Sequence, residues 1–185
     1  LPITILQVIY RNLTTSSIAR MNLFLHGITD GYIAHGDTLG RPALLNAKGG
    51  LQTFDVVLAN PPYSIKAWNR DAFASDSYGR NLWGVPPQNT ADYAFVQHIA
   101  KSLDPETGRA AILLPHGVLH RVAEGAVRRA MVESDIVEAV IGLAHGLFYN
   151  SGMEAIVLVL NANKSAERRR KVLFVDAKNE YYRSG

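Results

Sequence analysis

Residues 54–63 have the sequence FDVVLANPPY, in which a run of apolar, mostly β-branched residues stops at Asn-Pro-Pro-Tyr. Residues 56–58 are typical of a strand that is buried on both faces, as in the parallel sheets of α/β proteins. Two consecutive prolines cannot continue a sheet, so we expect the strand to end at Asn60. Ligands of open α/β sheets bind just beyond such strand ends. This stretch is therefore the predicted active site.

The four residues that follow the strand suit a flat molecule that carries an amino group. The side-chain oxygen of Asn60 and the carbonyl of Pro61 are two acceptors for the hydrogens of an NH2 group. Pro62 stiffens the turn, and the ring of Tyr63 can stack on a planar π system, which contributes about 1–3 kcal/mol per base. Taken alone, these residues are explained equally well as a strand, a Pro-Pro turn and an incidental Tyr.

The motif Phe-Asp-x-x-x-Ala-Asn-Pro-Pro-Tyr resembles the catalytic motif of S-adenosylmethionine-dependent amino-group methyltransferases. The surrounding sequence is similar to one branch of them, the modification subunit of type I restriction-modification systems, which methylates adenine N6 in DNA. The similarity extends from about residue 14 to residue 176. It includes five further segments in the expected order: Ile18–Leu23, Gly36–Leu39, Ala91–Phe95, Leu114–Leu119 and Leu147–Gly152.

The resemblance implies an α/β, Rossmann-like S-adenosylmethionine-dependent methyltransferase fold, with a mostly parallel sheet and a terminal antiparallel strand. The alternation of strand and helix patterns from Asp55 onward predicts the same class independently. We expect residues 1–185 to form a single domain, the C-terminal part of a methyltransferase catalytic domain. The family places its cofactor on a glycine-rich turn, and no Gly-x-Gly-x-x-Gly occurs here. We therefore expect the sequence to begin downstream of that turn and the fold to be incomplete.

Apolar patterns and turn residues predict the elements that surround the motif. A helix after Thr14 or Thr15 is expected to bury Ile18, Met21 and Leu25 and to end at Gly27. Further helices are predicted at 92–103 and 124–134, and strands at 1–10, 32–37, 109–115, 136–143, 155–160 and 172–175. The last two strands are expected to pair as an antiparallel hairpin.

The resemblance also assigns cofactor contacts, to Asp37, Thr38, Leu39, Asn60 and Phe95. An acidic or amide residue at the position of Asp37 accepts a hydrogen bond from the adenine amino group of the cofactor in this family. The alternative is that Asp37 caps a turn, as Asp commonly does. Phe95 lies at helical spacing with other apolar residues, so it equally fits a simple core position.

Tyr10 and Arg11 stand where family members usually have an acidic residue that binds the cofactor ribose. That ribose contact is therefore not expected in this chain. Phe148 matches the aromatic residue that packs against the extruded base in related adenine methyltransferases, and the alternative is one more buried Phe. His116 has no Cys, Asp or Glu at metal-ligand spacing, so we predict no metal site. His98 is expected on a solvated helix face.

Residues 63–89 form a long stretch without an obvious element, in which Lys66, Arg70 and Arg80 are mixed with aromatic residues. Loops of this length are usually functional or mobile. Basic and aromatic residues together are typical of a surface that meets DNA phosphates and bases. A lid that packs against other parts of the protein explains the stretch equally well.

Composition limits the remaining possibilities. The formal charge of +3 permits nucleic-acid binding without requiring it, and the absence of Cys excludes disulfides and thiolate metal sites. No apolar run is long enough to span a membrane, so we expect a cytoplasmic protein of a bacterium or archaeon. The resemblance implies three partners: double-stranded DNA, a specificity subunit and a restriction subunit.

We expect the chain to transfer a methyl group from S-adenosylmethionine to N6 of a flipped adenine. Two alternatives remain open. The same Asn-Pro-Pro-Tyr serves the methylation of a glutamine side chain in translation release factors, although the segments around Asp92, His116 and Asn150 favour DNA. The other alternative is a non-catalytic scaffold or DNA-binding module, which the missing glycine-rich loop favours.

Overall fold

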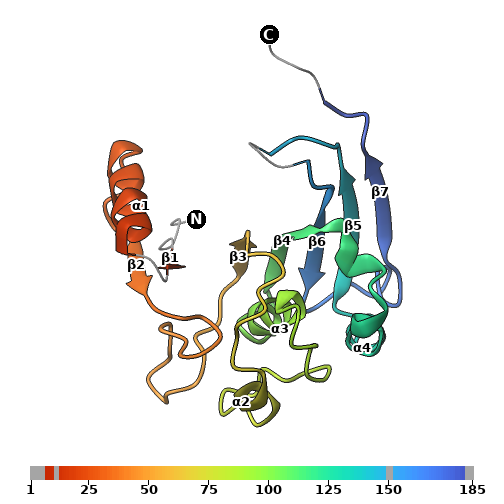
Figure 1. Cartoon of the computed structure of the whole chain (residues 1–185), viewed down its shortest axis with the longest axis horizontal. Coiled ribbons are helices and arrows are strands. Elements are labelled where there is room, and N and C mark those ends of the chain that lie inside the picture. The colour runs from red at the N-terminus through yellow and green to blue at the C-terminus, as the bar shows by residue number, and fades with distance from the viewer. Residues whose placement is uncertain (1–6, 11–12, 149–151, 182–185) are drawn as a thin grey trace. The chain divides into compact units, whose positions relative to one another are not determined.

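The computed structural model describes residues 7–10, 13–148 and 152–181 (Figure 1). Residues 1–6 of the first predicted strand, Arg11, and the central residues 149–151 of the last motif segment lie outside these ranges. The chain divides into two compact units, residues 1–52 and 53–185, which are described separately. Within the described residues, every helix is too short or too polar to cross a bilayer.

The first unit is a parallel strand–helix–strand arrangement. Strands β1 (Gln7–Tyr10) and β2 (Tyr32–His35) pair in parallel, and helix α1 (Leu13–Leu25) connects them. Gly27 follows the helix with a φ of 73°, the left-handed conformation that commonly ends helices. The buried side chains of α1 are Ser16 and Leu23.

The predicted apolar face of α1 is wrong. Ile18, Met21 and Leu25 are 64%, 61% and 73% exposed. The buried residues of α1, Ser16 and Leu23, lie on a different face of the helix from Ile18, Met21 and Leu25. Periodicity identified the helix but did not determine which of its apolar residues would be covered.

The second unit contains a five-stranded sheet in the order β3-β4-β6-β5-β7. Strands β3, β4, β5 and β7 run in one direction, and β6 is antiparallel to its neighbours β4 and β5. The elements of this unit, with two short 3-10 helices η1 and η2, are β3 (Val56–Ala59), α2 (Arg70–Ala74), α3 (Asp92–Lys101), β4 (Arg109–Pro115), η1 (His116–Leu119), η2 (Val122–Glu124), α4 (Gly125–Glu133), β5 (Val137–Leu143), β6 (Ala155–Asn161) and β7 (Leu173–Ala177).

The core of the second unit lies between the sheet and the helices α3 and α4. Apolar residues at helical spacing on α3, such as Tyr93, Val96 and Ile99, pack against alternate residues of the central strands, such as Ile112 and Leu158. The end of α3 is tied to the start of β3, because Phe54 N–H donates to the Ser102 carbonyl at 2.9 Å. This packing fixes the carboxyl end of β3 relative to the start of α3.

Two predictions about the sheet are wrong. Residues 155–160 and 172–175 do not form an antiparallel hairpin, because β6 lies between β4 and β5, and β7 pairs in parallel with β5. The antiparallel strand is therefore present but not terminal. Strand β3 is not buried on both faces: Val56 and Leu58 are 66% and 79% exposed, while Val57 and Ala59 pack against the core. In this unit β3 is an edge strand, and α3 covers only one of its faces.

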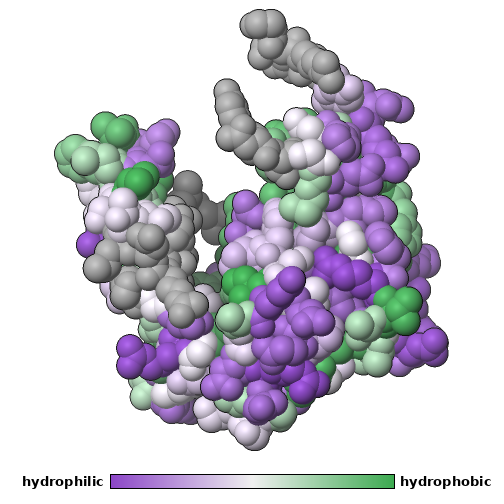
Figure 2. Space-filling view, in the orientation of Figure 1, coloured by the Kyte–Doolittle hydropathy of each residue, from purple (hydrophilic) through white to green (hydrophobic). Residues whose placement is uncertain are grey.

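Exposed apolar side chains are not confined to β3. Val122 in η2 is 93% exposed and Phe174 in β7 is 74% exposed. The face seen in Figure 2 is mainly hydrophilic over the second unit, with small separate apolar patches. Such scattered residues are ordinary for a globular surface.

Candidate active site at the end of β3

The turn Asn60–Tyr63 begins where β3 ends, as predicted. Asn60 and Pro62 are exposed, Pro61 is buried, and Tyr63 is half-buried. The two prolines lack the N–H groups that a continuing ladder needs, so the chain leaves the sheet at Asn60. This turn presents the amide of Asn60 to solvent at the carboxyl edge of the sheet.

Tyr63 and Asn60 are in direct contact. The Tyr63 hydroxyl donates a hydrogen bond to Asn60 Oδ1 at 2.7 Å. Burial and the negative charge of Asp92 both raise the pKa of Tyr63, so its hydroxyl keeps the proton that it donates. An amide oxygen has two lone pairs, and Asn60 Oδ1 can therefore accept a second hydrogen bond from a ligand.

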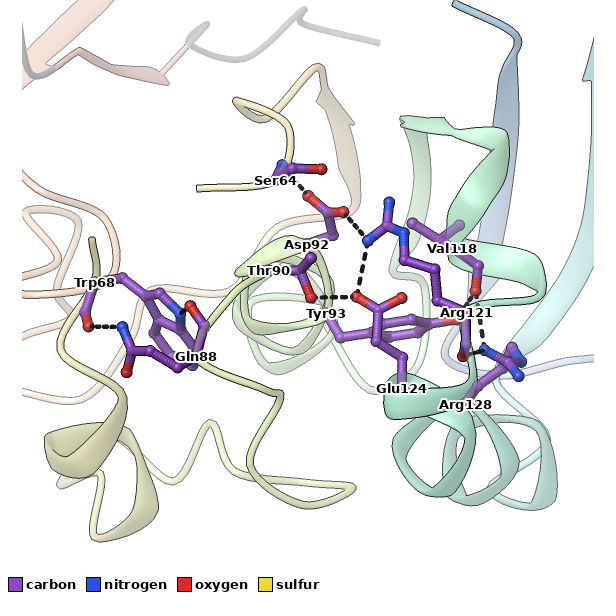
Figure 3. A network of polar contacts seen from close by, with 10 residues as sticks. All are labelled: Ser64, Trp68, Gln88, Thr90, Asp92, Tyr93, Val118, Arg121, Glu124 and Arg128. Carbon is purple, nitrogen blue, oxygen red and sulfur yellow. Dashed lines mark hydrogen bonds and ion pairs between the residues drawn. The ribbon is translucent and has the colours of Figure 1, made fainter. Parts of the chain in front are cut away.

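A buried polar network lies behind the turn (Figure 3). Ser64 N–H donates to Asp92 Oδ1 at 2.7 Å, and Arg121 Nη1 donates to Asp92 Oδ2 at 2.7 Å. Arg121 Nη1 also donates to Glu124 Oε1 at 3.0 Å, and the Thr90 hydroxyl donates to the same oxygen at 2.6 Å. The sequence indicated Asp92 only as part of a motif. The available signal was an acidic residue at the start of a helix whose next four residues are apolar or aromatic.

Burial affects the protonation of Glu124. Glu124 is fully buried, and its Oε2 has no hydrogen-bond partner among the described residues. Burial raises the pKa of Glu124, while the contacts from Thr90 and Arg121 lower it and do not compensate in full. Arg121 forms ion pairs with both buried carboxyl groups.

Phe95 and Phe148 lie in the second unit together with Asn60. Phe95 is in the first turns of α3 and is 9% exposed, within the range of a core residue. Phe148 follows β5 and is 36% exposed. Because β3 and β5 run in the same direction, Asn60 and Phe148 both follow strand ends at one edge of the sheet. The roles assigned to both aromatic residues remain predictions.

Asp37, Thr38 and Leu39 lie in the first unit, in the turn after β2. Asp37 Oδ1 accepts hydrogen bonds from the N–H groups of Leu39 at 3.1 Å and Gly40 at 3.0 Å. These bonds show that Asp37 caps its turn, as the alternative interpretation held. The side chain is nevertheless exposed, so its contact with a cofactor stays a prediction.

Residues 63–90 form a segment with internal hydrogen bonds between its start and its end. The short helix α2 begins after Asn69, whose side chain accepts a hydrogen bond from Ala72 N–H. Trp68 Nε1 donates to the Gln88 carbonyl at 3.1 Å, which ties the start of the segment to its end. Sequence patterns missed this structure because several of its hydrogen bonds join side chains to backbone carbonyls across the segment.

One of the three basic residues in this segment does not face solvent. Arg80 is 2% exposed, forms an ion pair with Asp76 at 2.6 Å, and lies over the rings of Phe73 and Tyr78. The predicted DNA-facing role of Arg80 is therefore wrong. Lys66 is exposed and the side chain of Arg70 is 39% exposed.

His98 is half-buried beside Arg80, so its predicted solvated position is wrong. Burial, and then the Arg80 charge, lower the pKa of His98 to about 4. The ordinary value for an unfolded chain is about 6.5. The unfolded state therefore binds a proton at a higher pH than the folded state, and we expect stability to fall as the pH decreases from about 6.5 to about 4.

The loss attributable to His98 is up to about 3 kcal/mol. Urea unfolding of wild type and His98→Gln over this pH range, followed by tryptophan fluorescence, measures it. The wild type should lose more stability than the variant as the solution is acidified. Parallel pH profiles for the two proteins would contradict the prediction.

Other features of the second unit do not form a competing site. Within the described ranges, no group of three or more His, Cys, Asp or Glu residues could hold a metal ion. An open pocket lies beside β5 and β7, with His116, Gly142 and Asp176 in its lining. None of the predicted catalytic residues lines that pocket.

Comparison with known proteins identifies relatives over nearly the whole chain. The sequence profile of the N-6 DNA Methylase family matches residues 9–185. This chain belongs to that family. It is 36% identical over 184 residues to the type I restriction enzyme MjaVIII methylase subunit of Methanocaldococcus jannaschii, covering 92% of this chain and 30% of the relative. It is 33% identical over 174 residues to the type I restriction enzyme HindI methylase subunit of Haemophilus influenzae, and the match covers 92% of this chain and 37% of that relative.

Two solved methyltransferase structures have a similar fold. The methyltransferase subunit of a type I restriction-modification system from Streptococcus thermophilus is 35% identical, with a TM-score of 0.85, and the match covers 96% of this chain and 37% of that one. A structure described as a class I S-adenosylmethionine-dependent methyltransferase from Listeria monocytogenes is 18% identical, with a TM-score of 0.68. That match covers 92% of this chain and 48% of the other, and it supports the fold alone. The predicted resemblance and the Rossmann-like fold are confirmed.

The chain spans about a third of the length of the curated relatives it matches. The family assignment therefore applies to the chain, whereas activity, substrate and partners of the whole protein are inferred below.

Proposed function

We propose that this chain contributes the catalytic residues of an enzyme that transfers a methyl group from S-adenosylmethionine to N6 of adenine in DNA. The main supporting observation is the exposed amide of Asn60 at the carboxyl end of β3, followed by Pro61, Pro62 and Tyr63. In an N-6 DNA Methylase chain, this arrangement offers acceptors for an exocyclic amino group and a ring for a planar base.

The proposed mechanism depends on positioning. The target amino group lies inside the duplex, so the adenine is flipped out at a cost of a few kcal/mol. Tyr63 and Phe148 offset part of this cost by packing against the base. Asn60 Oδ1 and the Pro61 carbonyl accept the two N6 hydrogens. The nitrogen then changes toward tetrahedral geometry and its lone pair becomes available for in-line attack.

The sulfonium of S-adenosylmethionine would supply the methyl group: its C–S bond would break as the N6–C bond forms, leaving a neutral thioether, and the methylated nitrogen would then lose one proton to solvent. Asp37, Thr38, Leu39, Asn60 and Phe95 are the residues that the family resemblance assigns to contacts with this cofactor. The exposed carboxylate of Asp37 is compatible with accepting a hydrogen bond from an adenine amino group. No strong general base is needed, because the acceptors stabilise the positive charge that develops on the nitrogen.

The proposed partners are double-stranded DNA, a specificity subunit that reads the DNA sequence, and a restriction subunit. The type I methylase subunits among the relatives support this assembly. Of the basic residues in the segment 63–90, Lys66 and Arg70 are accessible for phosphate contacts.

Transfer of tritium from labelled S-adenosylmethionine tests the proposal. The protein, co-expressed with the specificity subunit of its own system, is incubated with genomic DNA that lacks adenine methylation, or with release-factor protein. Label in N6-methyladenine is the expected result. Label in protein glutamine would indicate the alternative substrate. Absence of label together with no calorimetric heat of cofactor binding would instead indicate a scaffold.

A further inference from the structure

The residue that follows the active-site turn has an unusual backbone conformation. Ser64 has a φ of 51°, in the left-handed region that residues other than Gly rarely adopt. Such conformations persist where surrounding contacts fix them, and they often occur at functional sites. Because Ser64 directly follows Tyr63, its conformation sets the direction in which the chain leaves the Asn60–Tyr63 turn.

A single side chain fixes this conformation. Ser64 N–H donates to Asp92 Oδ1 at 2.7 Å, across 28 residues of sequence. Asp92 is 1% exposed and is the first residue of α3, a helix whose opening residues are all buried. The carboxylate is therefore attached to a rigid element of the core.

The second oxygen of Asp92 is held as firmly as the first. Arg121 Nη1 donates to Asp92 Oδ2 at 2.7 Å, and the same nitrogen donates to Glu124 Oε1 at 3.0 Å (Figure 3). The backbone of Arg121 is also held in place, because its N–H donates to the carbonyl of Gly117 in η1 at 3.0 Å. The carboxylate thus has one fixed partner for each oxygen.

We propose that Asp92 is a positioning residue that holds the Asn60–Tyr63 turn in the geometry required for methyl transfer. This inference rests on the proposed function. Asp92 does not touch the reacting atoms; it acts through the Ser64 backbone, and Arg121 orients its carboxylate. An acidic residue that merely stabilises the start of α3 would direct its oxygens to N–H groups of that helix, whereas both contacts of Asp92 described above lie outside it.

The chain contains a matched control. Asp135 also accepts a hydrogen bond from a backbone N–H of a residue with positive φ, Arg170, at 2.8 Å, and it also pairs with a buried cation, Lys164, at 2.6 Å. Asp135 and Arg170 precede β5 and β7, whereas Asn60 follows β3, so the control lies at the opposite edge of the parallel strands.

The test compares Asp92→Ala, Asp92→Asn and Asp135→Ala in the methyl-transfer assay and by amide hydrogen exchange. Asp92→Ala should lower kcat by about 10²-fold, the effect of a small misplacement of catalytic groups, and should accelerate exchange at Ser64. Asp92→Asn keeps an oxygen that can accept from Ser64 N–H and should recover most of kcat. Asp135→Ala should leave kcat and the exchange of Ser64 unchanged, even where it lowers stability.

Any one of three kinetic results would overturn the proposal: an Asp92→Ala kcat within about threefold of wild type, equal defects in the Ala and Asn variants, or an equal loss in Asp135→Ala. The exchange measurement needs no substrate. An unprotected Ser64 amide in the wild type therefore refutes the positioning contact itself, whereas a protected amide in a protein without transfer activity refutes the proposed function and the catalytic consequence with it.

Discussion

Asn60→Ala is expected to lower the rate of methyl transfer to DNA by at least about 10²–10³-fold, the effect of removing one preorganised polar group from an active site. The variant loses the side-chain acceptor for the N6 hydrogens and keeps the fold. Asn60 is exposed, and the hydrogen bond that it receives from Tyr63 is also exposed. The free energy of unfolding should therefore change by no more than about 0.5 kcal/mol.

The measurement is single-turnover tritium transfer together with thermal unfolding of the same preparation. Asn179→Ala is the matched control, because Asn179 is an exposed Asn in the same unit, beyond the other edge strand of the sheet. The control should transfer methyl groups at the wild-type rate. An Asn60→Ala protein that kept more than about a tenth of the wild-type rate would show that another group holds the amino nitrogen.

The contact between Tyr63 and Asn60 adds a second comparison. In this structure the Tyr63 hydroxyl occupies one of the two acceptor positions on Asn60 Oδ1. Tyr63→Phe removes that hydroxyl but keeps a ring for stacking. Its rate should fall far less than that of Asn60→Ala, because the proposed roles of the two side chains depend on different atoms.

Local sequence predicted the position of the turn because the responsible forces are local. A β-branched run followed by two prolines ends a strand whatever lies around it, and β3 ends at Ala59. The same holds for β4, whose predicted bounds, residues 109–115, match those of the strand. Strand partners depend on the whole sheet instead. Nothing in residues 155–175 indicates that β6 inserts between β4 and β5.

The parts of the site that the sequence did not predict depend on contacts between distant residues. The bond from Ser64 to Asp92 joins residues 28 positions apart, and Arg121, which contacts Asp92, lies beyond β4 in the sequence. The same limitation applies to Arg80, which composition placed on a DNA-facing surface but which Asp76 and two aromatic rings bury. Whether a charged side chain is buried can be predicted only when its ion-pair partner is known.

Arg121→Met is expected to cause the largest loss of stability of the substitutions considered, about 3–5 kcal/mol. It removes the cation from a cluster in which the side chains of Asp92 and Glu124 are each 1% exposed. Both carboxyl groups would then be buried without a charged partner, and Glu124 Oε2 already has no hydrogen bond among the described residues. Urea unfolding followed by the fluorescence of Trp68 and Trp83 reports on this unit, because both tryptophans lie within it.

Arg109→Met is the matched control for the ion pair. Arg109 is 58% exposed and pairs with Glu138 at 2.7 Å. Solvent screens such a pair, so its loss should change stability by no more than about 1 kcal/mol. Because Met keeps most of the aliphatic stem, equal losses in the two variants would show that the charge of Arg121 adds no more stability than that of an exposed ion pair.

The pH dependence of the Arg121→Met defect provides an independent test of its cause. Burial already raises the pKa of Glu124, and removal of Arg121 takes away a charge that lowers it. The folded variant would then bind a proton at a pH where the unfolded chain does not, so its stability rises as the pH falls. The difference from wild type should therefore shrink as the pH falls from neutral toward about 4.3, the ordinary value for Glu. A difference that stayed constant over this range would mean that unpaired carboxylates are not what destabilises the variant.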